Sequence, residues 1–80
     1  MHYVHLIESA YDRTRHYVGQ TGDLKQRLLD HNTGKSIYTQ RYKPWNLVCY
    51  LGFADEKKAL LFEKYLKTGS GRTFLRRHLL

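Results

Sequence analysis

The chain is short and strongly basic: its 80 residues include 14 lysines and arginines against 7 aspartates and glutamates, a formal net charge of +7. A chain of this length buries only roughly 60% of the surface that its unfolded form exposes, so we expect one modest core and one domain over residues 1–80. The single cysteine excludes an intrachain disulfide. No apolar run approaches the roughly 18 residues that cross a bilayer, and the amino end lacks a signal-peptide pattern. We therefore expect a soluble, cytoplasmic protein without a membrane partner.

The excess of positive charge favours a polyanionic partner. Phosphate backbones are the commonest polyanions available to such a protein, and aromatic residues, 14% of the chain, are interspersed with the charges. Charge that serves only solubility is the alternative interpretation of the same composition. Binding to a membrane surface is disfavoured because no predicted helix has a broad apolar face opposite a basic one.

The first predicted elements form an antiparallel pair of strands. Residues 3–8 are rich in β-branched and aromatic side chains, and strand alternation puts Tyr3, His5 and Ile7 on one face. The polar segment that follows permits a hairpin return into a second strand over residues 15–19.

Tyr17 stands out in this second strand, where it shares a face with Gly19. A strand tyrosine is usually a packing residue. The alternative is a phenol beside a ligand, with Gly19 leaving room for that ligand to approach the backbone closely.

A helix is predicted next. Asp23 can cap its start, with Gln26 three residues on completing a capping-box pattern, and Asn32-Thr33-Gly34 supplies a stop. Arg27 and His31 are four residues apart and therefore lie one above the other on the helix. We expect this stripe to be exposed, either as an ordinary solvated face or as part of a site.

The second half of the chain predicts one more strand and two helices. A basic, tyrosine-rich loop over residues 35–44 precedes a strand around residues 45–53. Asp55 can cap a helix over residues 56–67, and the tail "SGRTFLRRHLL" has the composition of a short, basic third helix.

Glu63 breaks the apolar pattern of the predicted second helix. Ala59, Phe62 and Leu66 fall within a narrow arc, and Glu63 lies inside or at the edge of it. A carboxylate in that position is costly unless a cation meets it. Two interpretations stay open, an ion pair with an arginine or another cation, and a ligand of Mg²⁺ completed by water and phosphate.

Five segments of the chain form a recognisable set: "YVH" at 3–5, "YVG" at 17–19, "DLKQRLLDHNTGKS" after it, "KPWNLV" before the third strand, and the helix that carries Glu63. In their order and spacing they resemble the GIY-YIG nuclease superfamily, in particular its small stand-alone members, and they are similar to the catalytic domain of the excision-repair nuclease subunit. The resemblance implies an α/β protein of the α+β type, with a small three-stranded antiparallel sheet flanked by helices. It also implies a DNA endonuclease, a phosphodiesterase with a single-metal site.

The resemblance assigns roles to four residues. Tyr17 matches the tyrosine that is proposed as general base for the attacking water, and Arg27 matches the arginine that contacts the scissile phosphate. His31 matches a histidine beside that arginine. Glu63 matches the carboxylate that holds the divalent metal, Mg²⁺ or Mn²⁺.

His5 is a departure from the family pattern, which has a second tyrosine at this position. An imidazole can also donate, accept and take up a proton near neutral pH. We therefore include His5 among the catalytic candidates and expect activity to fall below about pH 6 as it titrates. The departure keeps open a catalytically weak or inactive nucleic-acid-binding module on the same fold.

Basic residues outside the site are predicted to contact a DNA backbone, with branched or damaged DNA among the substrates considered. A protein-interaction domain with an acidic partner is the remaining alternative. The predicted backbone contacts lie in the basic loop and the tail: Lys35, Arg41, Lys43, Arg76 and Arg77.

Overall fold

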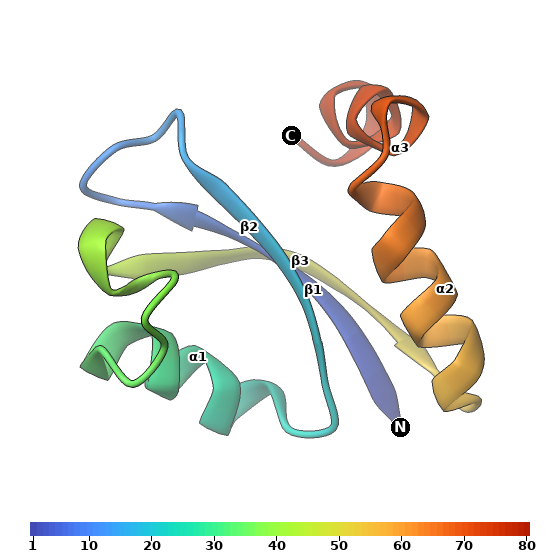
Figure 1. Ribbon diagram of the computed structural model, residues 1–80, viewed down its shortest axis with the longest axis horizontal. Helices are drawn as coiled ribbons and strands as arrows, with labels where there is room; N and C mark the ends of the chain where they lie inside the picture. The colour runs from blue at the N-terminus through green and yellow to red at the C-terminus, as the bar shows by residue number, and fades with distance from the viewer.

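The computed structural model describes residues 1–80 as a three-stranded antiparallel sheet with helices against it (Figure 1). The strand order is β2-β1-β3, which makes β1 the central strand. This is the α+β fold that the sequence predicts. The strands are β1 (His2–Ser9), β2 (His16–Thr21) and β3 (Trp45–Phe53), and the helices are α1 (Leu24–Thr33), α2 (Glu56–Leu66) and α3 (Gly69–Phe74).

The pairing of β1 with β2 decides which side chains share a face. Ile7 lies opposite Tyr17 and His5 lies opposite Gly19, so these four residues lie on one face of the sheet. The strand faces predicted from alternation are confirmed.

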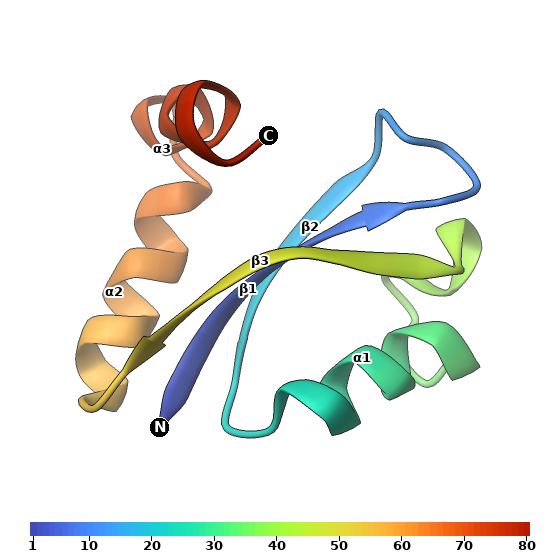
Figure 2. The ribbon, with the colours of Figure 1, turned by 180° about the vertical axis from the view of Figure 1, so that it is seen from behind.

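The main apolar core lies on the other face of the sheet. Val4, Leu6 and Val18 pack there against Ala59 and Leu66 of α2, while Leu75 closes the cluster from the C-terminal end. In both views α2 and α3 lie together on one side of the sheet and α1 lies on the other (Figures 1 and 2). The sheet is therefore covered from both sides, although it has only three strands.

The predicted helix caps fix where α1 begins and ends. The Asp23 side chain accepts a hydrogen bond from the Gln26 backbone N–H at 3.1 Å, and Gly34 ends the helix at a φ of 82°. The second half of the capping box does not form, because the Gln26 amide donates to Asp30 at 2.9 Å instead. The segment between α1 and β3 contains a single 3-10 turn, η1 (Gln40–Tyr42).

The C-terminal segment turns sharply after α2 and continues from α3 into a wider helical turn, η2 (Leu75–Leu79). Gly71 is buried at this turn, where a Cβ atom would collide with the backbone of Tyr65 and Leu66. Only glycine permits the close approach that seats α3 against the end of α2. No helix is both long and apolar enough to span a membrane.

Candidate active site

Three ring side chains from three different elements meet on the α1 side of the sheet. The ring centre of Tyr17 in β2 is 5.2 Å from that of His31 in α1 and 6.4 Å from that of His5 in β1. The two imidazole rings are 5.7 Å apart. The structure thus brings together the phenol and both histidines that the sequence singles out.

Gly19 makes this cluster possible, but not by leaving room for a ligand. A Cβ atom at Gly19 would lie 2.9 Å from Cε1 of His5 and 3.0 Å from Cε2 of Tyr17. The space above the glycine is therefore filled by the two side chains themselves. The sequence interpretation of Gly19 as an approach path for a ligand is wrong for this reason.

His31 is fully buried, which corrects the expectation of an exposed stripe on α1. Its Nδ1 lies 2.6 Å from the hydroxyl of Thr39, a buried residue of the segment before β3. The indole N–H of Trp45 donates to the Thr39 carbonyl at 2.8 Å and so holds Thr39 in place. Thr39 could not be recognised as a partner from the sequence, because the segment that carries it has no periodic pattern.

Arg27 lies one helical turn before His31 and is half-buried. Its Nε is buried without a hydrogen-bond partner in the protein, as are both ring nitrogens of His5 and Nε2 of His31. Buried polar atoms are rarely left unpaired in proteins. Four unpaired nitrogen atoms are therefore gathered in the region of the ring cluster.

The environment of the cluster keeps both imidazoles neutral near neutral pH. Burial lowers the pKa of His5 from 6.5 to about 4, and the nearby charges of His31, Arg27 and Lys67 act in the same direction. Burial, followed by the charge of Arg27, also lowers the pKa of His31. The sequence-based expectation of an acidic limb near pH 6 assumed the pKa of a solvated imidazole, whereas burial lowers the pKa of His5 well below that value.

We expect the stability of the folded protein to fall between pH 6.5 and pH 4. The unfolded chain takes up protons on His5 in this range while the folded chain does not, so the stabilisation is complete above pH 6.5 and is lost as pH falls through about 4. The lowered pKa of His5 corresponds to a loss of about 3 kcal/mol in the free energy of unfolding, and the lowered pKa of His31 acts in the same direction. Urea unfolding at a series of pH values measures it.

His5→Gln is expected to flatten the dependence of unfolding free energy on pH, because it removes the buried imidazole whose pKa falls on folding. If the unfolding free energies of the wild type and His5→Gln changed with pH in parallel, His5 would have the same pKa in the folded and unfolded chains.

Glu63 forms the ion pair that the sequence left open, with a lysine as its partner. The carboxylate oxygen Oε2 lies 3.1 Å from Nζ of Lys67, one turn further along the chain. The Glu63 side chain is 19% exposed, whereas that of Lys67 is 49% exposed. The same ammonium lies 5.8 Å from the ring centre of Tyr17, so this pair is linked to the ring cluster.

The fit of a divalent metal to this site rests on one carboxylate. No three His, Cys, Asp or Glu side chains lie together so as to hold a metal ion. Mg²⁺ is often bound through a single carboxylate, with water and substrate phosphate as its other ligands. In the structure the Oε2 atom of this carboxylate is paired with the ammonium of Lys67, so a metal ion at Glu63 would have to displace that ion pair.

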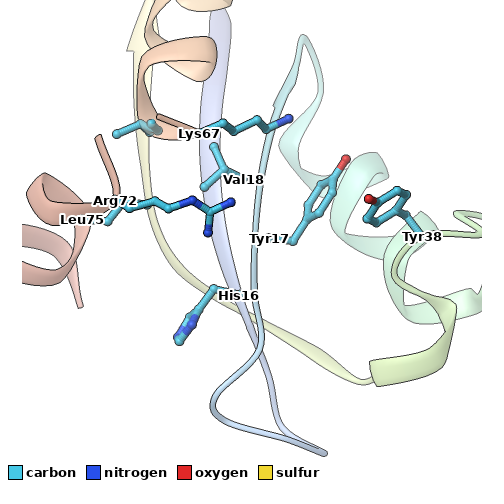
Figure 3. A pocket seen from close by; sticks show the side chains of 8 residues that line it. His16, Tyr17, Val18, Tyr38, Lys67, Arg72 and Leu75 are labelled. Atoms are coloured by element: carbon cyan, nitrogen blue, oxygen red, sulfur yellow. The ribbon is translucent and has the colours of Figure 1, made fainter. Parts of the chain in front are cut away.

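A pocket of about 400 Å³ opens at the free edge of β2, next to the cluster. Tyr17 and Lys67 both line it, together with Arg72 of α3 and Tyr38 of the segment before η1 (Figure 3). No pattern in the sequence singled out Lys67, Arg72 or Tyr38 as residues of a site. The spacing of Lys67, four residues after Glu63, could have identified Lys67 as the partner of that carboxylate.

The basic residues predicted to contact DNA lie outside this pocket in two groups. One group surrounds η1 and the other lies in η2, and the two regions are at opposite ends of the molecule in both ribbon views (Figures 1 and 2). Neither group lines the pocket. The first consists of Lys35, Arg41 and Lys43 and the second of Arg76 and Arg77, all exposed.

A comparison with known protein families matches residues 1–76 to the GIY-YIG catalytic domain. The chain belongs to the GIY-YIG family. This confirms the resemblance found in the sequence and places the chain in a nuclease family. The cluster around Tyr17 lies where β2, which carries the signature segment "YVG", packs against α1, the helix that follows it in the chain.

Bacterial UPF0213 proteins are similar to this GIY-YIG chain. One from Streptococcus pneumoniae serotype 4 is 40% identical over 53 residues, which cover 65% of the chain and 54% of that protein. One from Bacillus pumilus is 35% identical over 68 residues, 84% of the chain and 67% of that protein. One from Streptococcus pyogenes serotype M5 is 38% identical over 72 residues, 89% and 76% respectively. The chain thus spans only about half of the first relative's length.

Proposed function

We propose that this protein is a metal-dependent endonuclease that hydrolyses phosphodiester bonds of DNA. The observation that carries the proposal is the packing of the Tyr17 phenol against two buried imidazoles, with an unpaired guanidinium nitrogen of Arg27 beside them. A phenol at the edge of the sheet and an arginine from the adjoining helix suit attack by water on a phosphate. The net charge of +7 suits a polyanionic substrate.

Tyr17 is the residue that we assign to the attacking water. A phenol has an unperturbed pKa near 10 and is a poor base unless another group takes its proton. The imidazoles do not supply that acceptor. Neither ring nitrogen of His5 nor Nε2 of His31 has a hydrogen-bond partner, and a pKa lowered to about 4 makes His5 a weak base. Tyr17 lines the open pocket instead, and it would accept the proton of the attacking water as its own hydroxyl proton passes to solvent there.

Arg27 is assigned to the phosphate, where negative charge grows on the oxygens during attack. A fixed guanidinium stabilises that charge more strongly in the transition state than in the ground state. Glu63 would hold a divalent metal such as Mg²⁺ or Mn²⁺, which when bound supplies Lewis-acid stabilisation of the phosphate and the leaving oxygen. The two exposed basic groups at η1 and η2 would contact the DNA backbone on either side, in a substrate that includes branched or damaged forms.

We expect Tyr17→Phe to lower the cleavage of DNA by about 10²- to 10⁴-fold, the range typical of a lost general base. The fold should persist, because the change removes only the hydroxyl from a half-buried ring. Cleavage of linear, nicked and branched DNA in the presence of Mg²⁺ or Mn²⁺ measures the effect. Tyr11→Phe, which removes an exposed hydroxyl from the hairpin between β1 and β2, is the matched control.

A catalytically weak module that only binds nucleic acid is the second candidate, favoured by His5 at the position of a family tyrosine. The same assay separates the two candidates. Salt-dependent binding of DNA by the wild type, without cleavage between pH 5 and pH 8 in either metal, would support the binding module and exclude the endonuclease. Cleavage by Tyr17→Phe at the wild-type rate would instead remove Tyr17 from the mechanism.

A further inference from the structure

The pocket at the free edge of β2 is larger than hydrolysis of a single phosphate requires. Its volume is about 400 Å³, within the range of roughly 300–1,000 Å³ that is typical of small-molecule sites. Figure 3 shows it between the helical side, which contributes Lys67 and Arg72, and the side of Tyr38, with the strand that bears Tyr17 between them. It therefore has room for a nucleotide unit beyond the phosphate that Tyr17 would act on.

The charge of the pocket is positive and partly uncompensated. Lys67 and Arg72 line it, and no carboxylate does. Lys67 shares its charge with Glu63, whereas Arg72 forms no salt bridge in the structure. A free guanidinium offers paired N–H donors that match the oxygens of a phosphate. The pocket is thus suited to an anion, and its strongest anchor is Arg72.

Tyr17 is the boundary between this pocket and the buried histidines. Its ring packs against His31 at 5.2 Å and also lines the pocket, where the Lys67 ammonium lies 5.8 Å from the ring centre. A phosphate held by Arg27 and Tyr17 would therefore lie directly beside the pocket. A DNA strand that continues from this phosphate along the edge of β2 reaches Lys67 and Arg72 next.

Tyr38 favours a nucleotide over a free anion in this pocket. Its side chain is 84% exposed, and its ring centre lies 6.2 Å from that of Tyr17. An exposed ring that shares a pocket with cationic side chains offers a platform on which an unpaired base can stack.

We propose that Lys67 and Arg72 form a second phosphate-binding subsite, which holds the phosphate next to the one that is cleaved. The subsite rests on the proposed function, because it presumes that Tyr17 and Arg27 act on a phosphate of a nucleic acid. Its substrate class is a DNA strand with at least two consecutive phosphates. Its role is to fix the register of that strand against Tyr17.

Binding of small nucleotides to the metal-free protein tests the subsite without any need for cleavage. By calorimetry, thymidine 3′,5′-bisphosphate should bind about tenfold more tightly than thymidine 5′-monophosphate or 3′-monophosphate, as expected for one added charged contact. Arg72→Gln should reduce the affinity for the bisphosphate to that for the monophosphates. Arg13→Gln makes the same change in charge on the exposed β1–β2 hairpin, outside the pocket, and should preserve the preference.

Three outcomes would overturn the subsite: equal affinities for the bisphosphate and both monophosphates, equal losses in Arg72→Gln and Arg13→Gln, and inorganic phosphate that binds as tightly as the bisphosphate. The failure of the proposed function is distinguishable from these. The protein could bind the bisphosphate more tightly than the monophosphates, lose that preference in Arg72→Gln, and yet cleave no DNA. This result would support the subsite and contradict only the proposed nuclease activity.

Discussion

Arg27→Ala is expected to lower the rate of DNA cleavage by about 10²- to 10³-fold, as the loss of one preorganised donor to a transition state does. Arg27 lies beside the ring cluster, where its charge contributes to the lowered pKa of both His5 and His31. Its Nε has no partner in the protein, so its donors are available to a phosphate. The affinity for DNA should change only slightly, because the remaining basic residues still contact the backbone. Single-turnover cleavage and titration binding measure the two effects.

Lys25→Ala is the control for Arg27→Ala, since it removes an exposed cation from the same turn of α1. It should leave the cleavage rate at the wild-type level and weaken binding modestly. Equal losses of affinity and of kcat/KM in Arg27→Ala, with kcat intact, would identify Arg27 as an ordinary backbone contact.

Glu63→Gln is expected to abolish both divalent-metal binding and metal-dependent cleavage. The substitution removes the charge of the ligand and almost none of its volume. The fold should persist, because a partly exposed pair such as Glu63 with Lys67 contributes at most about 1 kcal/mol. Binding of Mn²⁺ in the presence of a short DNA, measured by electron paramagnetic resonance, follows the metal independently of cleavage.

The matched control for Glu63→Gln lies at the other end of the same helix. Glu56 is exposed in the first turn of α2, 3.6 Å from a ring nitrogen of His2, and Glu56→Gln should change neither metal affinity nor cleavage. A large loss of thermal stability in Glu63→Gln with an unchanged affinity for Mn²⁺ would establish a purely structural ion pair.

Local patterns were sufficient to predict the elements of this fold. Alternation along β1 and β2 placed His5 and Tyr17 on the faces that they occupy, because the side-chain period of a strand leaves only two choices. The ends of α1 followed from Asp23 and Gly34, since a cap is a contact between residues close in the chain. The family also followed from the sequence, because the order and spacing of its motifs are properties of the chain itself.

The tertiary structure decided which of these residues share one environment. His31 was expected on an exposed stripe, and it is buried because the segment before β3 folds back over α1 and places Thr39 against it. Burial between these elements, with the nearby charges of His31, Arg27 and Lys67, lowers the pKa of His5, which no local pattern could reveal.

The sequence by itself determined the helices, the strands, their faces and the family of this protein. Only the tertiary structure decided that Lys67 is the partner of Glu63 and that Arg72 and Tyr38 line one pocket with Tyr17. The physical reason is that the pocket forms between segments far apart in the chain. Its composition depends on how α2 and α3 pack against β2, and that packing leaves no periodic signal in the sequence.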